Sequence, residues 1–193
     1  MNNAFNTIIN LRGRDVIRQL DGSDDVLKVI VTPQKGENRR ATKFLEPNEF
    51  WLFSVNDALS VHPSEGDIFT RDAGNFLIVE TQYDTAADTL KCGVYMLPFQ
   101  LEYHAPIEDQ YTDDGKPLFE APITIFGNKE EVGRVLDRWK GLNEDTEVFI
   151  IPPVENKPRK GSKFVWNGKT TTIDKSQPLY SSNGKFIGWR LKG

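Results

Sequence analysis

Short runs of β-branched, aromatic and other apolar residues recur along the chain, separated by turns rich in glycine, proline, asparagine and aspartate. Alternation of apolar and polar positions with a period of two is typical of strands that bury one face. The pattern therefore predicts a mainly β protein. The predicted strands cover residues 15–20, 26–31, 50–55, 67–71, 76–81, 91–97, 99–103, 122–126, 147–151, 163–166, 169–173 and 185–191.

One segment has helical spacing instead. Apolar residues from Val132 to Trp139 recur three and four positions apart, and Asn128 precedes them as a candidate N-cap. Glycine at position 141 suits the C-terminal end of a helix. We therefore predict one short helix over residues 129–140.

Two stretches fit neither pattern. Near the N-terminus, Phe5, Ile8 and Ile9 fall on one side of a helical turn that is too short to be stable alone. We expect this N-terminal arm to pack on its own barrel or on a neighbouring molecule. Residues 33–48 show little periodicity and predict a long loop.

Two parts of the chain resemble each other at an offset of 95 residues, so that residue 63 matches residue 158. Pro-Ser-Glu-Gly-Asp-Ile-Phe at 63–69 matches Pro-Arg-Lys-Gly-Ser-Lys-Phe at 158–164. The other matches are 93–97 with 188–192, and Phe53 and Val55 with Val148 and Ile150. Three matches in one register favour a duplication.

The duplication predicts two tandem small β-barrels or sandwiches, with the short helix in the second. The first unit covers residues 1–103 and includes the N-terminal arm. Residues 104–121, rich in aspartate, proline and glycine, are predicted to be an acidic linker. The second unit covers residues 122–193.

Composition excludes several classes of protein. With 193 residues, 38% of them hydrophobic and 27% charged, the chain can form a packed core. A single cysteine and two histidines exclude a disulfide framework and a zinc site built from several such ligands. We expect no membrane span, because no apolar run approaches about 18 residues, and no signal peptide. We therefore expect a soluble intracellular protein.

Charge is unevenly distributed along the chain. Residues 100–147 contain five basic and twelve acidic residues, a net charge of −7, whereas residues 148–193 contain nine basic and two acidic, a net charge of +7. The basic segment could be a solvated surface, an interface between identical subunits, or a nucleic-acid contact. The nucleic-acid candidates are Arg159, Lys160 and Lys163, interleaved with the aromatic residues Trp166, Tyr180 and Trp189.

Candidate catalytic and cofactor motifs fail on their spacing. An EF-hand-like run starting at Asp109 has glycine at the wrong position, and Gly161-Ser162-Lys163 is not a phosphate-binding loop. His62 and His104 accompany no recognisable serine or cysteine nucleophile. We therefore expect no catalytic residues, no cofactor and no metal. A hydrolase that uses a pair of carboxylates stays open as the least favoured alternative.

The turn Pro63-x-x-Gly66-Asp67-x-Phe69, the later strand Gly93–Leu97 and the opening segment 11–18 resemble the head–tail connector proteins of tailed bacteriophages, of the head-closure (stopper) or joining type. The resemblance covers about two thirds of the chain. Proteins of that family are usually one barrel of about half this length, and this chain looks like a duplicated form. It implies a structural virion protein of the neck, located in the virion and not an enzyme. Its copies would form a ring that joins or seals the capsid portal to the tail.

The resemblance also implies partners. These would be other copies of the chain in a cyclic ring, a portal or adaptor protein, tail proteins, and DNA that passes through the channel without sequence recognition, but no membrane. The candidate interface residues are Phe5, Ile8, Ile9, Arg39 and Arg40. The alternative function is a single-stranded nucleic-acid-binding module with an OB-like barrel.

Overall fold

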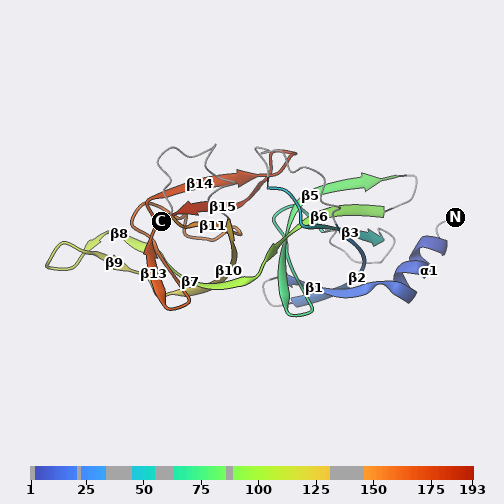
Figure 1. Cartoon of the computed structure of the whole chain (residues 1–193), viewed down its shortest axis with the longest axis horizontal. Helices are drawn as coiled ribbons and strands as arrows, with labels where there is room; N and C mark the ends of the chain where they lie inside the picture. Colours follow the sequence, from blue (N-terminus) through green and yellow to red (C-terminus); the bar gives the residue numbers. More distant parts are fainter. Residues whose placement is uncertain (1–2, 21–22, 34–44, 55–62, 86–88, 131–145) are drawn as a thin grey trace. The chain divides into compact units, whose positions relative to one another are not determined.

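The protein is mainly β, as predicted, with one closed barrel and one curled seven-stranded sheet (Figure 1). A computed structural model describes residues 3–20, 23–33, 45–54, 63–85, 89–130 and 146–193. In these ranges the elements are α1 (Asn3–Arg12), β1 (Arg14–Leu20), β2 (Ser23–Pro33), β3 (Glu49–Ser54), β4 (Ile68–Arg71), β5 (Gly74–Asp84), β6 (Thr89–Leu97), β7 (Phe99–His104), β8 (Pro106–Tyr111), β9 (Pro117–Phe119), β10 (Ile123–Glu130), β11 (Val148–Ile151), β12 (Lys163–Trp166), β13 (Lys169–Thr172), β14 (Lys175–Tyr180) and β15 (Phe186–Lys192).

The chain divides into two compact units. Unit 1 consists of Met1–Met96 with Tyr180–Ile187, and unit 2 of Leu97–Leu179 with Gly188–Gly193. The boundary differs from the predicted one at residue 103, because β7 is a strand of unit 2. The predicted linker 104–121 also differs, since it contains strands β8 and β9 within unit 2.

Unit 1 is a closed barrel with strand order β1-β2-β3-β6-β5-β4. Its interior is filled by aromatic side chains from three strands, with Trp51 within 6.3 Å of the rings of Phe53, Phe69 and Phe76. Burying such rings removes a large apolar area from water, which is the main term that stabilises a barrel this small. Core residues alternate along four strands, as the period of two predicted; the pairs are Leu27 and Val29, Trp51 and Phe53, Phe76 and Ile78, and Cys92 and Val94.

Unit 2 repeats this strand order in an opened form, β13-β12-β7-β10-β11-β15-β14. β4 and β12 begin at residues 68 and 163, and β5 and β13 at residues 74 and 169, so both pairs keep the offset of 95. The long strand β5 corresponds to two shorter strands, β13 and β14. Unit 2 also carries β8 and β9 between β7 and β10, where unit 1 joins β1 directly to β2.

The turn that precedes β4 and β12 is the same in both units. Gly66 N–H donates to Ile78 O at 2.9 Å, and Gly161 N–H donates to Ile173 O at 2.8 Å. Both glycines have φ of 92°, which side chains with a Cβ rarely adopt. The next turn is also shared, because positions 72–73 and 167–168 all have positive φ, the geometry of the predicted type I′ hairpin at Asn167-Gly168.

One predicted match does not hold in the strand pairing. Phe53 pairs with Leu90 on β6, but Val148 pairs with Lys192 on β15, which corresponds to residue 97. Val55 lies outside the described residues. The similarity of the two units therefore lies in the turns and in the strands next to them.

The predicted helix over 129–140 differs from the structure at its start, because β10 continues through Lys129 to Glu130. Its remaining residues lie outside the described part of the chain. The described helix is α1, near the N-terminus. It ends at Arg12. The N–H of the following Gly13 donates to Ile9 O at 2.7 Å, and a Cβ at Gly13 would come within 2.3 Å of the same oxygen.

The two units differ in the side chain that accepts a hydrogen bond inside the shared turn. In unit 1, Asp67 accepts from Ser64 N–H at 2.8 Å and from the Arg18 guanidinium at 2.5 Å. In unit 2, Ser162 accepts from Arg159 N–H at 3.1 Å and from the Tyr103 hydroxyl at 3.4 Å. Burial raises the pKa of Tyr103, so its hydroxyl stays protonated and can donate.

Arg18 and Tyr103 occupy equivalent places, since Arg18 lies opposite Phe69 and Tyr103 opposite Phe164. Because the Arg18 side chain is only 5% exposed, its charge depends on the Asp67 carboxylate. A charged pair in one unit thus corresponds to a neutral pair in the other.

We expect Asp67→Asn to lower the unfolding free energy of unit 1 by about 3 kcal/mol, because it removes the anion beside a buried guanidinium. The double variant Arg18→Tyr/Asp67→Ser, which copies unit 2, should recover most of this loss. Ser162→Ala, the matched change in unit 2, should cost about 1 kcal/mol. Urea unfolding followed by tryptophan fluorescence measures all three, and a double variant no more stable than Asp67→Asn would contradict the equivalence.

Candidate assembly surface

The region that the sequence predicted to be a linker forms a two-stranded sheet in unit 2. We call this sheet the acidic hairpin and define it as residues 106–119. It extends away from β7 and β10 (Figure 1). Its two strands pair antiparallel, with Pro106 opposite Phe119 and Tyr111 opposite Pro117. The hairpin contains four acidic residues and one lysine, so its net charge is −3.

Side chains of unit 2 hold the base of the acidic hairpin. Arg159 donates through Nη2 to Pro106 O at 2.7 Å and lies 3.5 Å from the Glu108 carboxylate. Lys163 places its ammonium 4.3 Å from the centre of the Phe119 ring. An isolated two-stranded hairpin is marginal in water, so these contacts give this one its orientation.

The far end of the hairpin is also ordered by its own hydrogen bonds. Thr112 N–H donates to Lys116 O at 2.7 Å, and Gly115, with φ of 77°, donates to Thr112 O at 2.8 Å. Hydrogen bonds from Lys116 and Thr112 lower the pKa of Asp114. The tip is therefore a formed turn that presents its carboxylates in a defined arrangement.

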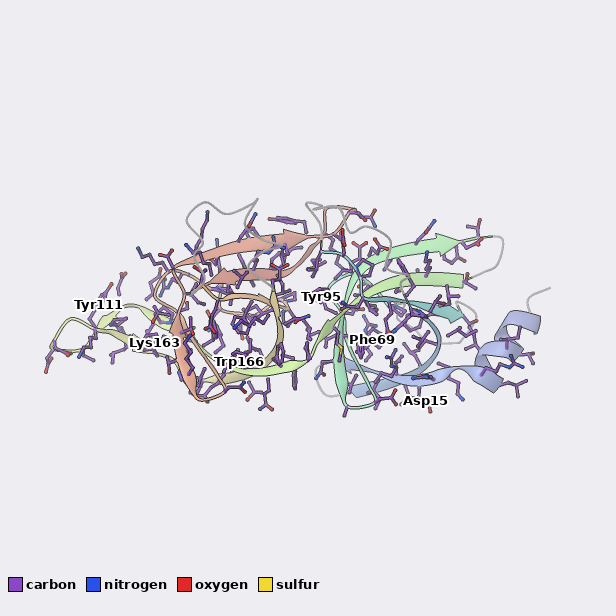
Figure 2. The ribbon with its side chains drawn as sticks, in the orientation of Figure 1. Asp15, Phe69, Tyr95, Tyr111, Lys163 and Trp166 are labelled. Carbon is purple, nitrogen blue, oxygen red and sulfur yellow. The ribbon has the colours of Figure 1, made fainter. Side chains whose placement is uncertain are left out.

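Large side chains of the hairpin are exposed despite this order. The Tyr111 side chain lies on the hairpin (Figure 2). It is 62% exposed, and Leu118 is 38% exposed. Asp109 has φ of 55° and lies where the strand register shifts, so the edge of β8 is bulged. A bulged edge pairs poorly with an added strand, so a partner would contact side chains rather than backbone.

The structure places two of the predicted nucleic-acid residues at the base of this hairpin. Arg159 and Lys163 make the contacts described above. Lys160 points to solvent, with 84% of its side chain exposed and its ammonium 3.9 Å from Asp174.

The aromatic residues near these charges do not form an open stacking platform in unit 2. Trp166 packs edge-on against Phe99 and Phe149, with ring centres 5.4 and 5.5 Å away. Trp189 is 8% exposed, and Lys157 lies 5.6 Å from its ring centre. Tyr180, 49% exposed, belongs to unit 1.

Another carboxylate of unit 2 gathers basic side chains internally. Glu147 accepts from Thr171 at 2.7 Å and lies 3.1 Å from Lys129 and 3.3 Å from Lys169. Burial raises the pKa of Glu147, but the hydrogen bonds from these three side chains together lower it by more than burial raises it, so the net shift is downward. Arg190 likewise lies 2.7 Å from Glu130, so part of the positive charge in residues 148–193 is paired within unit 2.

The predicted interface residues at the N-terminus divide between the two sides of α1. Ile9 is buried, at 1% exposure, whereas Ile8 is 46% exposed. Leu11, which the sequence did not single out, is 79% exposed. The side chain of Phe5, and Arg39 and Arg40 altogether, lie outside what the structure describes.

Cys92 and His104, which are side chains of types that act in catalysis, lie in structural surroundings. Burial raises the pKa of the Cys92 thiol, and Asp67, Glu65 and Glu80 raise it further, so the thiol stays neutral and unreactive. His104 lies 2.9 Å from Glu102. Over the ranges described, no group of three or more histidine, cysteine, aspartate and glutamate side chains could hold a metal ion, and no helix is long and apolar enough to cross a membrane. His62 lies outside these ranges.

Comparisons with known proteins do not assign the chain to a family. No protein-family model matches the chain, and no curated protein matches it. Among solved structures, MrkH of K. pneumonia in its apo state aligns at 9% identity over 97% of this chain and 79% of that one, with a TM-score of 0.23. A TM-score this low does not show a common fold, so the site has to be interpreted from its own geometry.

We expect Arg159→Ala to loosen the acidic hairpin without unfolding unit 2. Removal of a charge-assisted hydrogen bond should raise amide exchange in residues 106–119 about tenfold. Lys160→Ala, which removes a neighbouring charge that does not touch the hairpin, is the matched control. Hydrogen–deuterium exchange with mass spectrometry measures both, and equal exchange in the two variants would contradict the role of Arg159.

Proposed function

We propose that the chain is a structural protein of the bacteriophage head–tail connector (neck), whose copies form a ring around the DNA channel between portal and tail. The observation that carries the proposal is the acidic hairpin, which is held at its base by Arg159 and Lys163 while its tip exposes both apolar and acidic side chains. The matching Pro-x-x-Gly turns, which carried the resemblance to connector proteins, are consistent with the same class.

An exposed element that adds nothing to its own core is best explained by a partner. Unit 2 buries its own strands without the hairpin, because Phe149 and Phe164 pack against each other with ring centres 4.6 Å apart. Elements that project from one subunit and meet a different surface on the next create heterologous contacts, and such contacts close into rings when the rotation per subunit allows. The hairpin is suited to this role.

The overall charge suits a protein that lines a path for DNA. The chain has a net charge of −4, which disfavours tight retention of a polyanion. A channel protein must let DNA pass without sequence recognition. The portal or adaptor protein and the tail proteins are the expected neighbours of the ring.

The nucleic-acid alternative has less support. Arg159 and Lys163, two of its three candidate residues, are committed to the acidic hairpin. Trp166 lies among other aromatic rings of unit 2. A single-strand binder needs exposed aromatic faces beside free cations.

We expect the purified full chain, alone or mixed with the portal and tail proteins of its phage, to form closed rings. Heterologous interfaces between identical copies should give one symmetric species rather than a continuous ladder of sizes. Native mass spectrometry and electron microscopy measure the assembly, and proteomic analysis of purified virions locates it. A chain that stays monomeric in every mixture and is absent from virions would refute the connector proposal.

Binding to single-stranded DNA should be weak and insensitive to Trp166→Ala. Fluorescence anisotropy of a labelled oligonucleotide, recorded across a salt series, gives the affinity and the number of phosphate contacts. Tight binding that both Trp166→Ala and Lys160→Ala weaken would favour the nucleic-acid module instead. Lys28→Glu, a charge change on β2 of unit 1, provides the control for general electrostatic effects.

A further inference from the structure

Unit 2 also has an exposed basic surface, which is opposite in charge to the acidic hairpin. Residues 157–161, which we call the basic turn, contain Lys157, Arg159 and Lys160 and no acidic residue. Ser176 donates to Pro158 O at 2.6 Å, which brings the beginning of β14, including the exposed Lys175, against this turn. The result is a cluster of basic side chains on one unit.

The acidic charge next to this cluster is already shared. Asp174 lies 3.9 Å from Lys160 and 3.6 Å from Lys192, so one carboxylate faces two ammonium groups. Lys160 remains 84% exposed. The cluster therefore keeps a net positive charge that faces solvent.

The hairpin of the same chain supplies only one anion to this cluster, Glu108 at its base. Arg159 binds the base of its own hairpin, at Pro106 and Glu108. The tip carboxylates follow the end of β8, which is six residues long. At about 3.3 Å per residue, the tip is then roughly 17 Å beyond the base. Asp114 bonds to Lys116 and Thr112 within the tip. Asp113 beside it is thus positioned for another molecule.

We propose that the tip of the acidic hairpin of one copy binds the basic turn and Lys175 of the next copy, and that this contact joins neighbours in the ring. The inference rests on the proposed function and names its interface. Glu108 and Arg159 already pair within one chain. The rest of the hairpin carries a net charge of −2 and the turn keeps Lys157 and Lys160, so the surfaces are complementary in sign. The exposed ring of Tyr111 adds apolar area to the contact.

A charge-exchange experiment on the full chain tests the interface. In Asp113→Lys, the hairpin tip repels a wild-type basic turn, and in Lys160→Glu the basic turn repels a wild-type tip. Each variant alone should associate about tenfold more weakly than the wild type. Mixed in equal amounts, the two variants should regain association, because each tip then meets a turn of opposite charge. The double variant Asp113→Lys/Lys160→Glu should associate with itself.

A matched pair controls for charge change as such. Asp15→Lys and Lys28→Glu alter an exposed pair on β1 and β2 whose charged atoms are 3.8 Å apart, and should leave association unchanged. Circular dichroism confirms that each variant folds, and analytical ultracentrifugation over a salt series measures association, which should weaken as salt rises.

The outcomes separate this inference from the proposed function. Wild-type rings that Asp113→Lys and Lys160→Glu leave intact would overturn the interface and keep the connector proposal. Variants that weaken association but are not restored by mixing would also overturn the pairing, because each would then act through another surface. A wild type that never assembles would overturn both.

Discussion

The backbone turn at Gly66 and Gly161 is the constraint on which each unit depends. It carries the chain from one strand of the barrel into the next, and its glycine N–H donates across to the strand that follows the type I′ hairpin. A left-handed φ of 92° at both glycines makes the turn tight enough for Phe69 and Phe164 to enter their cores directly afterwards. Once the turn is set, the strand order on either side of it follows.

The backbone of this turn is the same in both units, but the side chains that bond within it differ. Arg18 and Asp67 form a buried ion pair, and Tyr103 and Ser162 form a neutral hydrogen bond at the corresponding positions. The neutral version avoids the desolvation of two charges. It also leaves Arg159, whose N–H closes the turn, with a side chain available for the acidic hairpin. The same short segment thus forms the turn before β12 and orients the hairpin.

Local sequence patterns predicted the turns and strands whose conformation depends on nearby residues. The turn glycines, the Asn167-Gly168 hairpin and most strands could be identified, because each depends on a few adjacent residues. The acidic hairpin could not, since its strands are short, polar and stabilised by contacts with residues about fifty positions later, such as Arg159. The assignment of β7 to unit 2 is similar: only Pro98 separates it from β6, and the pairing of β7 with β10 and β12 decides its sheet.

The proposed interface is weak as a single contact, and this suits a ring. An exposed ion pair contributes at most about 1 kcal/mol, and salt reduces it further. In a closed ring, however, every copy uses its hairpin toward one neighbour and its basic turn toward the other. Removing one copy then breaks two contacts at once, whereas an open pair is held by one. Closure converts modest electrostatic pairs into a stable assembly, while each contact stays reversible enough for incorrect intermediates to dissociate and reassemble.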